Sequence, residues 1–237
     1  MDPISVYTVI SLAAGCGKDL YTFISASKDV DVNVKALYDE VGALEKTSRA
    51  VEATLERGDL GAFQDAMLWD DARASLGACD ASLRSLQKDI RGVSSVKGED
   101  KTMNNFGKAV AQLKLNMKED EIRKHRDQLQ SHRLSLLAIV QMIAVHVSAS
   151  APSIILEQLM PRMQLLESYV TMIHESNSRL EQRLAGEKDE DGSIILQASK
   201  RVIQNAETLL HGVAETIADD DRYVHPKHVH CVTATIF

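Results

Sequence analysis

Apolar side chains recur every three or four residues along six long segments of this chain, and this spacing limits what the chain can fold into. It places the apolar residues of each segment on one face of an α-helix. Each helix must bury that face against another helix, so the pattern predicts an all-α fold: an antiparallel bundle of about five or six long helices. The predicted helices cover about residues 3–27, 30–57, 63–91, 106–147, 153–185 and 193–218.

The composition agrees with this fold class. Only 4% of the 237 residues are aromatic, and the chain has 12 glycines and four prolines. These numbers disfavour a β-sandwich or a β-propeller. We expect residues 1–218 to form a single domain. The fourth segment is either one long helix or two helices joined near residues 115–118.

The first predicted helix has no charged side chain from Pro3 to Gly17. Asp2 can cap a helix that begins at Pro3. The apolar residues spread around most of its circumference, so it must be buried by neighbouring helices or by lipid. A secretory signal is disfavoured because the first basic residue, Lys18, follows the apolar stretch. The uncharged run is also shorter than the roughly 20 residues that span a bilayer.

A second uncharged stretch runs from Leu134 to Leu156, which is long enough to raise the question of a membrane span. Gln141, His146 and Pro152 interrupt its apolar part, so we interpret it as a central core helix. The charged segment before it, KEDEIRKHRDQLQSHR, mixes both signs. We interpret that segment as a solvated face crossed by an apolar stripe of Ile122, Leu129 and Leu136.

The charges and cysteines exclude several functions. A net charge of -7 gives no basic surface for nucleic acid. Cys16, Cys79 and Cys231 are widely separated and odd in number, which indicates reduced intracellular thiols. The GCGK at residues 15–18 is not a phosphate-binding loop, because Leu12 and Asp19 stand where that motif needs Gly and Ser or Thr. We expect its two glycines, Gly15 and Gly17, to let another helix approach closely or to loosen the helix there.

The end of the chain, residues 219–237, is expected to be a loosely ordered acidic tail containing histidines. His225, His228, His230 and Cys231 are metal-ligand residue types, but two adjacent ligands such as His230 and Cys231 rarely point at one ion. The sequence shows no nucleophile motif, zinc signature or dinucleotide turn either. We therefore expect no enzyme activity, and we assign no catalytic, cofactor or metal residue and no small-molecule substrate.

Several stretches of the first 143 residues resemble a known family. MDPISV, VISLAAGCGKDLYTFI, DVNVKALYDEVGAL and KLNMKEDEIRKHRDQLQSHRLSLLAIVQM together are similar to the HeLo-like N-terminal domain of fungal STAND (nucleotide-binding, NLR-like) proteins. The same family label is attached to a protein of an azaphilone-pigment biosynthesis cluster. The resemblance implies an all-α bundle. In better-understood relatives, such a bundle is a cell-death or incompatibility effector that oligomerises and inserts its N-terminal helix into the plasma membrane.

That resemblance suggests two functions for this chain. The first is a non-enzymatic domain that acts through protein partners or self-association and whose first helix engages an anionic membrane. The residues that would reach lipid or another copy are Ile4, Val6, Val9, Ile10 and Leu12. This function places the protein in the cytoplasm, with a peripheral position at the plasma membrane. The alternative is a soluble regulatory or accessory protein encoded in a secondary-metabolite gene cluster.

Overall fold

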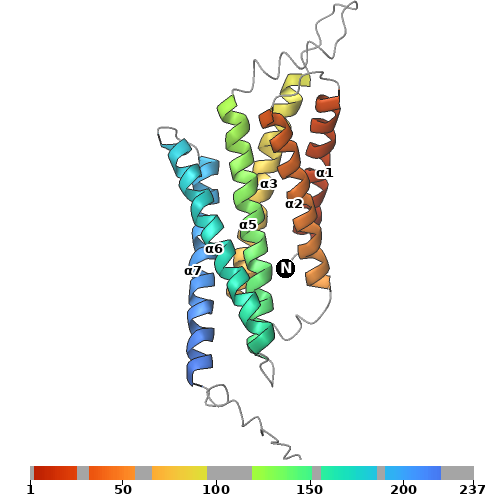
Figure 1. The fold of residues 1–237 in the computed structure, drawn as a ribbon. Coiled ribbons are helices and arrows are strands. Elements are labelled where there is room, and N and C mark those ends of the chain that lie inside the picture. Colours follow the sequence, from red (N-terminus) through yellow and green to blue (C-terminus); the bar gives the residue numbers. More distant parts are fainter. Residues whose placement is uncertain are drawn as a thin grey trace, which may run out of the picture.

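Six α-helices are present in the computed structural model, which describes residues 3–25, 32–56, 66–94, 119–150, 156–185 and 190–219. They are α1 (Pro3–Ser25), α2 (Val32–Glu56), α3 (Ala66–Ser94), α5 (Glu119–Ala149), α6 (Leu156–Leu184) and α7 (Glu190–Asp219). No strand occurs within these ranges. The predicted all-α bundle is confirmed (Figure 1). Residues 106–118 of the fourth predicted helix and residues 220–237 of the tail lie outside the described residues.

The helices alternate in direction along the bundle, and α5 occupies its centre (Figure 1). α5 packs against α2, α3, α6 and α7. α1 lies at one edge, where it packs mainly against α2 and α3, while α6 and α7 form the opposite side. The acidic residues Glu119, Asp120 and Glu121 favour the start of α5, because negative charge stabilises a helix N-terminus.

The apolar side chains form two main cores that meet at α5. The first core joins α1, α2 and α3 to the first half of α5, and the second joins the second half of α5 to α6 and α7. Fully buried members of the first core include Cys16, Leu37, Leu83 and Leu136, and those of the second include Met142, Leu166, Ile173 and Val202. The bundle therefore depends on α5 more than on any edge helix.

The uncharged second half of α5 lies inside the second core, as predicted for a central helix. Its buried side chains include Leu134, Ala138, Ile139, Met142, Ile143 and Val145. By length and composition, α5 is the one described helix that could cross a membrane, and half of its most apolar stretch is buried inside the protein. The core helix of a soluble protein passes the same test. Packing within the bundle is thus enough to explain why this segment is apolar.

The interpretation of the charged first half of α5 as a solvated face is wrong in part. Its apolar stripe is buried, as predicted. However, five of its polar side chains are buried as well: His125, Asp127, Gln128, Ser131 and His132. α5 is covered by four other helices, so only a narrow part of its surface can face solvent.

Pro161 lies inside α6, where the sequence predicts a kink or a short break; the helix is not broken and runs from Leu156 to Leu184. A proline inside a helix removes one backbone hydrogen bond to the carbonyl four residues earlier. Here that carbonyl belongs to Glu157, in the exposed first turn of the helix, where water can replace the lost donor.

Two methionine substitutions test the central position of α5. Met142 of α5 is fully buried, whereas Met172 on the outer side of α6 is 38% exposed. We expect Met142→Ala to lower the free energy of unfolding by about 2–5 kcal/mol, because it removes buried contacts and leaves a cavity. Met172→Ala is the matched control and should change it by less than about 1 kcal/mol. Urea denaturation measures both values, and similar losses in the two variants would contradict the packing described here.

Candidate functional site

The five residues predicted to reach a membrane all lie on α1, at the edge of the bundle. The structure describes the side chain of one of them, Leu12, which is partly buried and packs against the first core. The side chains of the other four lie outside the described part of the chain: Ile4, Val6, Val9 and Ile10. In this state the protein covers part of the Leu12 side chain.

Two glycines of α1 face the neighbouring helices. A Cβ atom added at Gly15 would lie 3.1 Å from Nε2 of Gln87 on α3, which is closer than most real contacts. A Cβ atom added at Gly17 would lie 3.8 Å from Cγ1 of Val41 on α2, an ordinary contact distance. The space beside Gly15 is thus occupied by the end of the Gln87 side chain.

Mostly small side chains hold the described part of α1 in place. Ala13, Cys16 and Leu20 are buried in the first core, and only the last of them is large. Burying a leucine side chain contributes about 1.5–3 kcal/mol, and smaller side chains contribute less. The described contacts of α1 are thus close but involve little apolar area.

A pair of polar contacts joins α3 to α5 within the bundle. Ser82 Oγ lies 2.8 Å from His132 Nε2, and Asp89 Oδ2 lies 2.9 Å from His125 Nε2. Ser82 and Asp89 are seven residues apart on α3, and so are His125 and His132 on α5. The later residue on α3 contacts the earlier residue on α5. Seven residues are about two helical turns, so antiparallel helices bring both pairs into contact at once. These pairs fix the register of α3 against α5.

The Ser82 and His132 pair does not resemble a working catalytic triad. Both residues are buried, although Ser82 borders a small pocket of about 140 Å³. The third member of a triad is an acid that orients the same histidine. Here the nearby acid, Asp89, contacts His125 instead. The arrangement therefore suits a structural role.

Burial lowers the pKa of His132 from its ordinary value of 6.5 to about 3. Desolvation disfavours the charged imidazolium, so this histidine is neutral in the folded protein at neutral pH. In the unfolded chain the same histidine takes up a proton below about pH 6.5. Between these two values the unfolded state binds more protons, and the stability of the fold decreases as the pH falls.

His132 should therefore make the fold sensitive to mild acid. Its contribution to the free energy of unfolding should fall by about 2 kcal/mol between pH 7 and pH 5. His132→Gln removes the titrating group, so its loss of stability over this range should be smaller than that of the unaltered chain by this amount. Urea denaturation of both proteins at the two pH values measures the difference. Equal pH dependence of the two proteins would rule out a neutral His132 in the fold.

A second buried polar group, Asp127 of α5, faces arginines. Its side chain is 1% exposed, Arg183 Nε of α6 lies 2.7 Å from Oδ2, and Arg126 lies 3.5 Å from Oδ1. Neither carboxylate oxygen has a hydrogen bond of good geometry within the described structure. The charge of Asp127 is thus balanced by ion pairing, and this pairing links α5 to α6.

Removing one partner should leave this carboxylate buried without its closest opposite charge. We expect Arg183→Met to lower the free energy of unfolding by about 3 kcal/mol. The control is Arg49→Met, which breaks an exposed ion pair with Glu45 on α2 and should cost less than about 1 kcal/mol. Thermal or urea unfolding of both variants tests this difference. An Arg183 variant as stable as the control would show that the pair contributes little.

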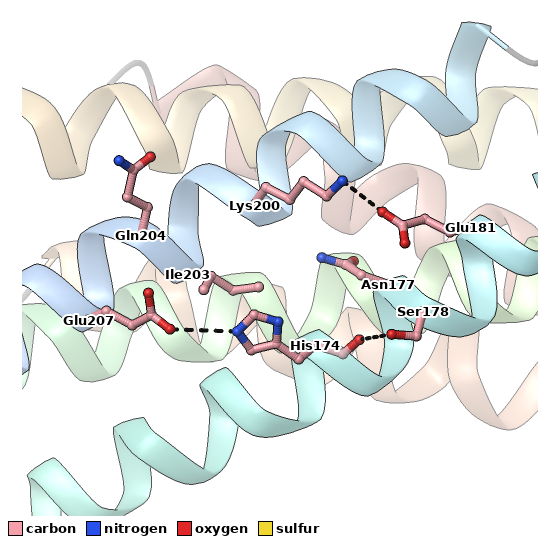
Figure 2. A pocket seen from close by; sticks show the side chains of 8 residues that line it. All are labelled: His174, Asn177, Ser178, Glu181, Lys200, Ile203, Gln204 and Glu207. Carbon is pink, nitrogen blue, oxygen red and sulfur yellow. Dashed lines mark hydrogen bonds and ion pairs between the residues drawn. The ribbon is translucent and has the colours of Figure 1, made fainter.

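A pocket of about 340 Å³ lies between α6 and α7 (Figure 2). Its lining comprises His174, Asn177, Ser178, Glu181, Lys200, Ile203, Gln204 and Glu207. Lys200 Nζ lies 2.7 Å from Glu181 Oε1, and His174 Nε2 lies 3.6 Å from Glu207 Oε1. The partners are two helical turns apart on each helix, so one ion pair borders each end of the pocket.

Asn177 lies in this pocket between the two ion pairs (Figure 2). Its side-chain oxygen accepts hydrogen bonds from Ser199 of α7 at 2.9 Å and from Ser131 of α5 at 3.4 Å. Its side-chain nitrogen is buried and has no hydrogen-bond partner among the described residues. One amide thus joins three helices and leaves an unused donor.

Cysteines and metal ligands add no further site to the described part of the chain. Cys16 and Cys79 are buried and form no disulfide within the described residues, and burial raises the pKa of the Cys79 thiol. No group of three or more His, Cys, Asp and Glu residues in the described ranges could hold a metal ion. The predicted tail residues His225, His228, His230 and Cys231 lie outside those ranges.

Sequence reasoning missed the polar contacts of α5 and the pocket at α6 and α7. The seven-residue spacing of His125 and His132 was a usable signal, because Ser82 and Asp89 have the same spacing on a neighbouring helix. Nothing in the sequence around Asn177 marks it as buried. Its environment depends on serines 46 and 22 residues away along the chain.

Comparison of the chain with models of known protein families, with curated proteins and with solved structures gives no match. Its function is therefore inferred from the arrangement of its own residues.

Proposed function

We propose that this chain is a non-enzymatic helical module that acts through protein partners or self-association, and that α1 engages membrane lipid when it leaves the bundle. The observation that carries this proposal is the position of α1. It packs at an edge, mainly against α2 and α3, and the described part is held mostly by small side chains. The described members of the second core include no residue of α1, so we expect that core to persist when α1 moves away.

The composition of α1 supports the same proposal. Its only charged residues are Lys18 and Asp19, which cancel, so the helix has no net charge to keep it out of lipid. The whole chain, by contrast, carries a net charge of -7 and is repelled by an anionic surface. Membrane binding by α1 would thus depend on apolar burial. Residues 1–143 resemble HeLo-like domains, and the proposal includes the role of those domains in cell death.

The proposal of a non-enzymatic role has its own support. The serine and histidine that contact each other, Ser82 and His132, are buried. The ion pairs at the pocket between α6 and α7 join exposed side chains, which suits recognition better than acid–base chemistry. The acid near Ser82 contacts a different histidine, His125, so the pair lacks the third member of a catalytic triad.

One observation favours the alternative of a soluble regulatory or accessory protein, of the kind encoded in secondary-metabolite gene clusters. Ala13, Cys16 and Leu20 are almost completely buried, so in this state α1 is an ordinary core helix. A protein that never releases α1 would use it for stability alone. Membrane binding separates the two functions.

Removing residues 1–12 tests the role of α1 directly. The deletion ends just before Ala13, so the described buried contacts of α1 are kept. We expect the intact chain to bind vesicles and release a trapped dye, and the shortened chain to lose both activities while keeping most of its helical circular dichroism. Zwitterionic vesicles and vesicles with anionic lipid should both be used, since apolar burial predicts binding to each.

A deletion of equal length at the other end, residues 226–237, is the matched control and should leave vesicle binding unchanged. Sedimentation of the same samples reports self-association. If the intact chain binds neither kind of vesicle, at low salt and at concentrations that promote association, the membrane role is excluded. The soluble alternative then remains.

A further inference from the structure

The pocket between α6 and α7 has a polar donor that the protein itself does not use. Asn177 is 5% exposed, and its side-chain nitrogen has no hydrogen-bond partner among the described residues. A buried polar group without a partner destabilises a fold, and such groups are uncommon in native structures. A leucine or an alanine at this position would avoid the unpaired donor.

The surrounding hydrogen bonds hold this donor in one orientation. Ser131 and Ser199 both donate to the side-chain oxygen of Asn177, which turns the oxygen toward the core. The nitrogen is then directed to the opposite side. Figure 2 shows it pointing toward the space that His174, Ile203 and Lys200 surround. The orientation of the donor is thus fixed, and a ligand reaches the buried nitrogen after a small movement of the side chains that line the pocket.

Opposite charges border the two ends of the pocket. The Lys200 ammonium lies near the donor of Asn177 at one end, and the Glu207 carboxylate lies at the other (Figure 2). A carboxylate suits the first end and a protonated amine suits the second. With Glu181 included, the rim has two carboxylates, one ammonium and the imidazole of His174, so a ligand that carries only a negative charge meets no excess of positive charge.

We propose that this pocket binds a small zwitterion of the amino-acid type. The carboxylate of the ligand accepts a hydrogen bond from Asn177 Nδ2 and pairs with Lys200, and its amine pairs with Glu207. Ile203 offers an apolar surface for an alkyl side chain. The volume of about 340 Å³ is within the usual range of small-molecule sites. This inference does not depend on membrane binding by α1.

Three related ligands test the charge requirement with the full-length chain. L-leucine carries both charges, 4-methylpentanoate lacks the amine, and 3-methylbutylamine lacks the carboxylate. Glycine and L-phenylalanine extend the range of sizes. Two-dimensional ¹H–¹⁵N NMR spectra report the side-chain amide of Asn177 during each titration. We expect a saturable shift with a zwitterion and at least about ten-fold weaker binding of the two single-charge analogues.

Variants of the exposed rim locate the site without disturbing the core. Lys200→Met and Glu207→Gln should each weaken zwitterion binding at least about ten-fold. Lys46→Met on α2 and Glu215→Gln near the end of α7 replace the same residue types at exposed positions outside the pocket and should change it less than about two-fold. The proposal is wrong if none of the three zwitterions shifts the Asn177 resonance, if a single-charge analogue binds equally well, or if the control variants weaken binding as much as the rim variants.

Discussion

The central helix must satisfy polar side chains while other helices cover most of its surface. α5 packs against four helices, yet its first half carries histidines, an aspartate and serines at buried positions. Each of these groups loses contact with water, and without a partner it would destabilise the fold. His132 contacts Ser82 and Asp127 contacts Arg183. Because polar contacts are directional, they set the alignment of α5 against α3 and α6, which apolar packing alone would leave less well defined.

Because both cores share α5, much of the stability of the fold comes from the centre of the bundle, whereas the proposed activities lie at its edges. Three of the largest fully buried side chains, Leu129, Leu136 and Met142, belong to α5, so the edges can change with less effect on the whole. Both proposed activities lie at edges: the membrane helix on the α1 side and the small-molecule pocket between α6 and α7. Two independent activities on opposite sides of one bundle could also be coupled through α5, which contacts both α2 and α6.

The helices and most of the apolar core could be predicted from the sequence, because the period of apolar residues reports which face of a helix is buried. Leu37, Leu83 and Leu166 follow this pattern and are fully buried. The buried polar residues could not be predicted in the same way. The residues next to Asp127 in the sequence are those expected around an exposed charge. Its burial depends on Arg183, which is brought close only by the fold. The burial of Asn177 likewise depends on residues that are distant in the sequence. At Pro161 the rule that proline interrupts a helix fails because the residue lies close to the start of α6.

The reactivity of the two buried cysteines depends on how often α1 separates from the bundle. Cys16 lies on α1 and Cys79 on α3, both are completely buried, and burial raises the pKa of the Cys79 thiol. The thiolate is the form of cysteine that attacks an alkylating reagent, so neither buried sulfur reacts quickly while the helices stay together. Their alkylation rate, followed by peptide mass spectrometry to separate them from Cys231, therefore reports how often α1 swings away from α3. In a chain that releases α1, alkylated Cys16 and Cys79 therefore accumulate with time.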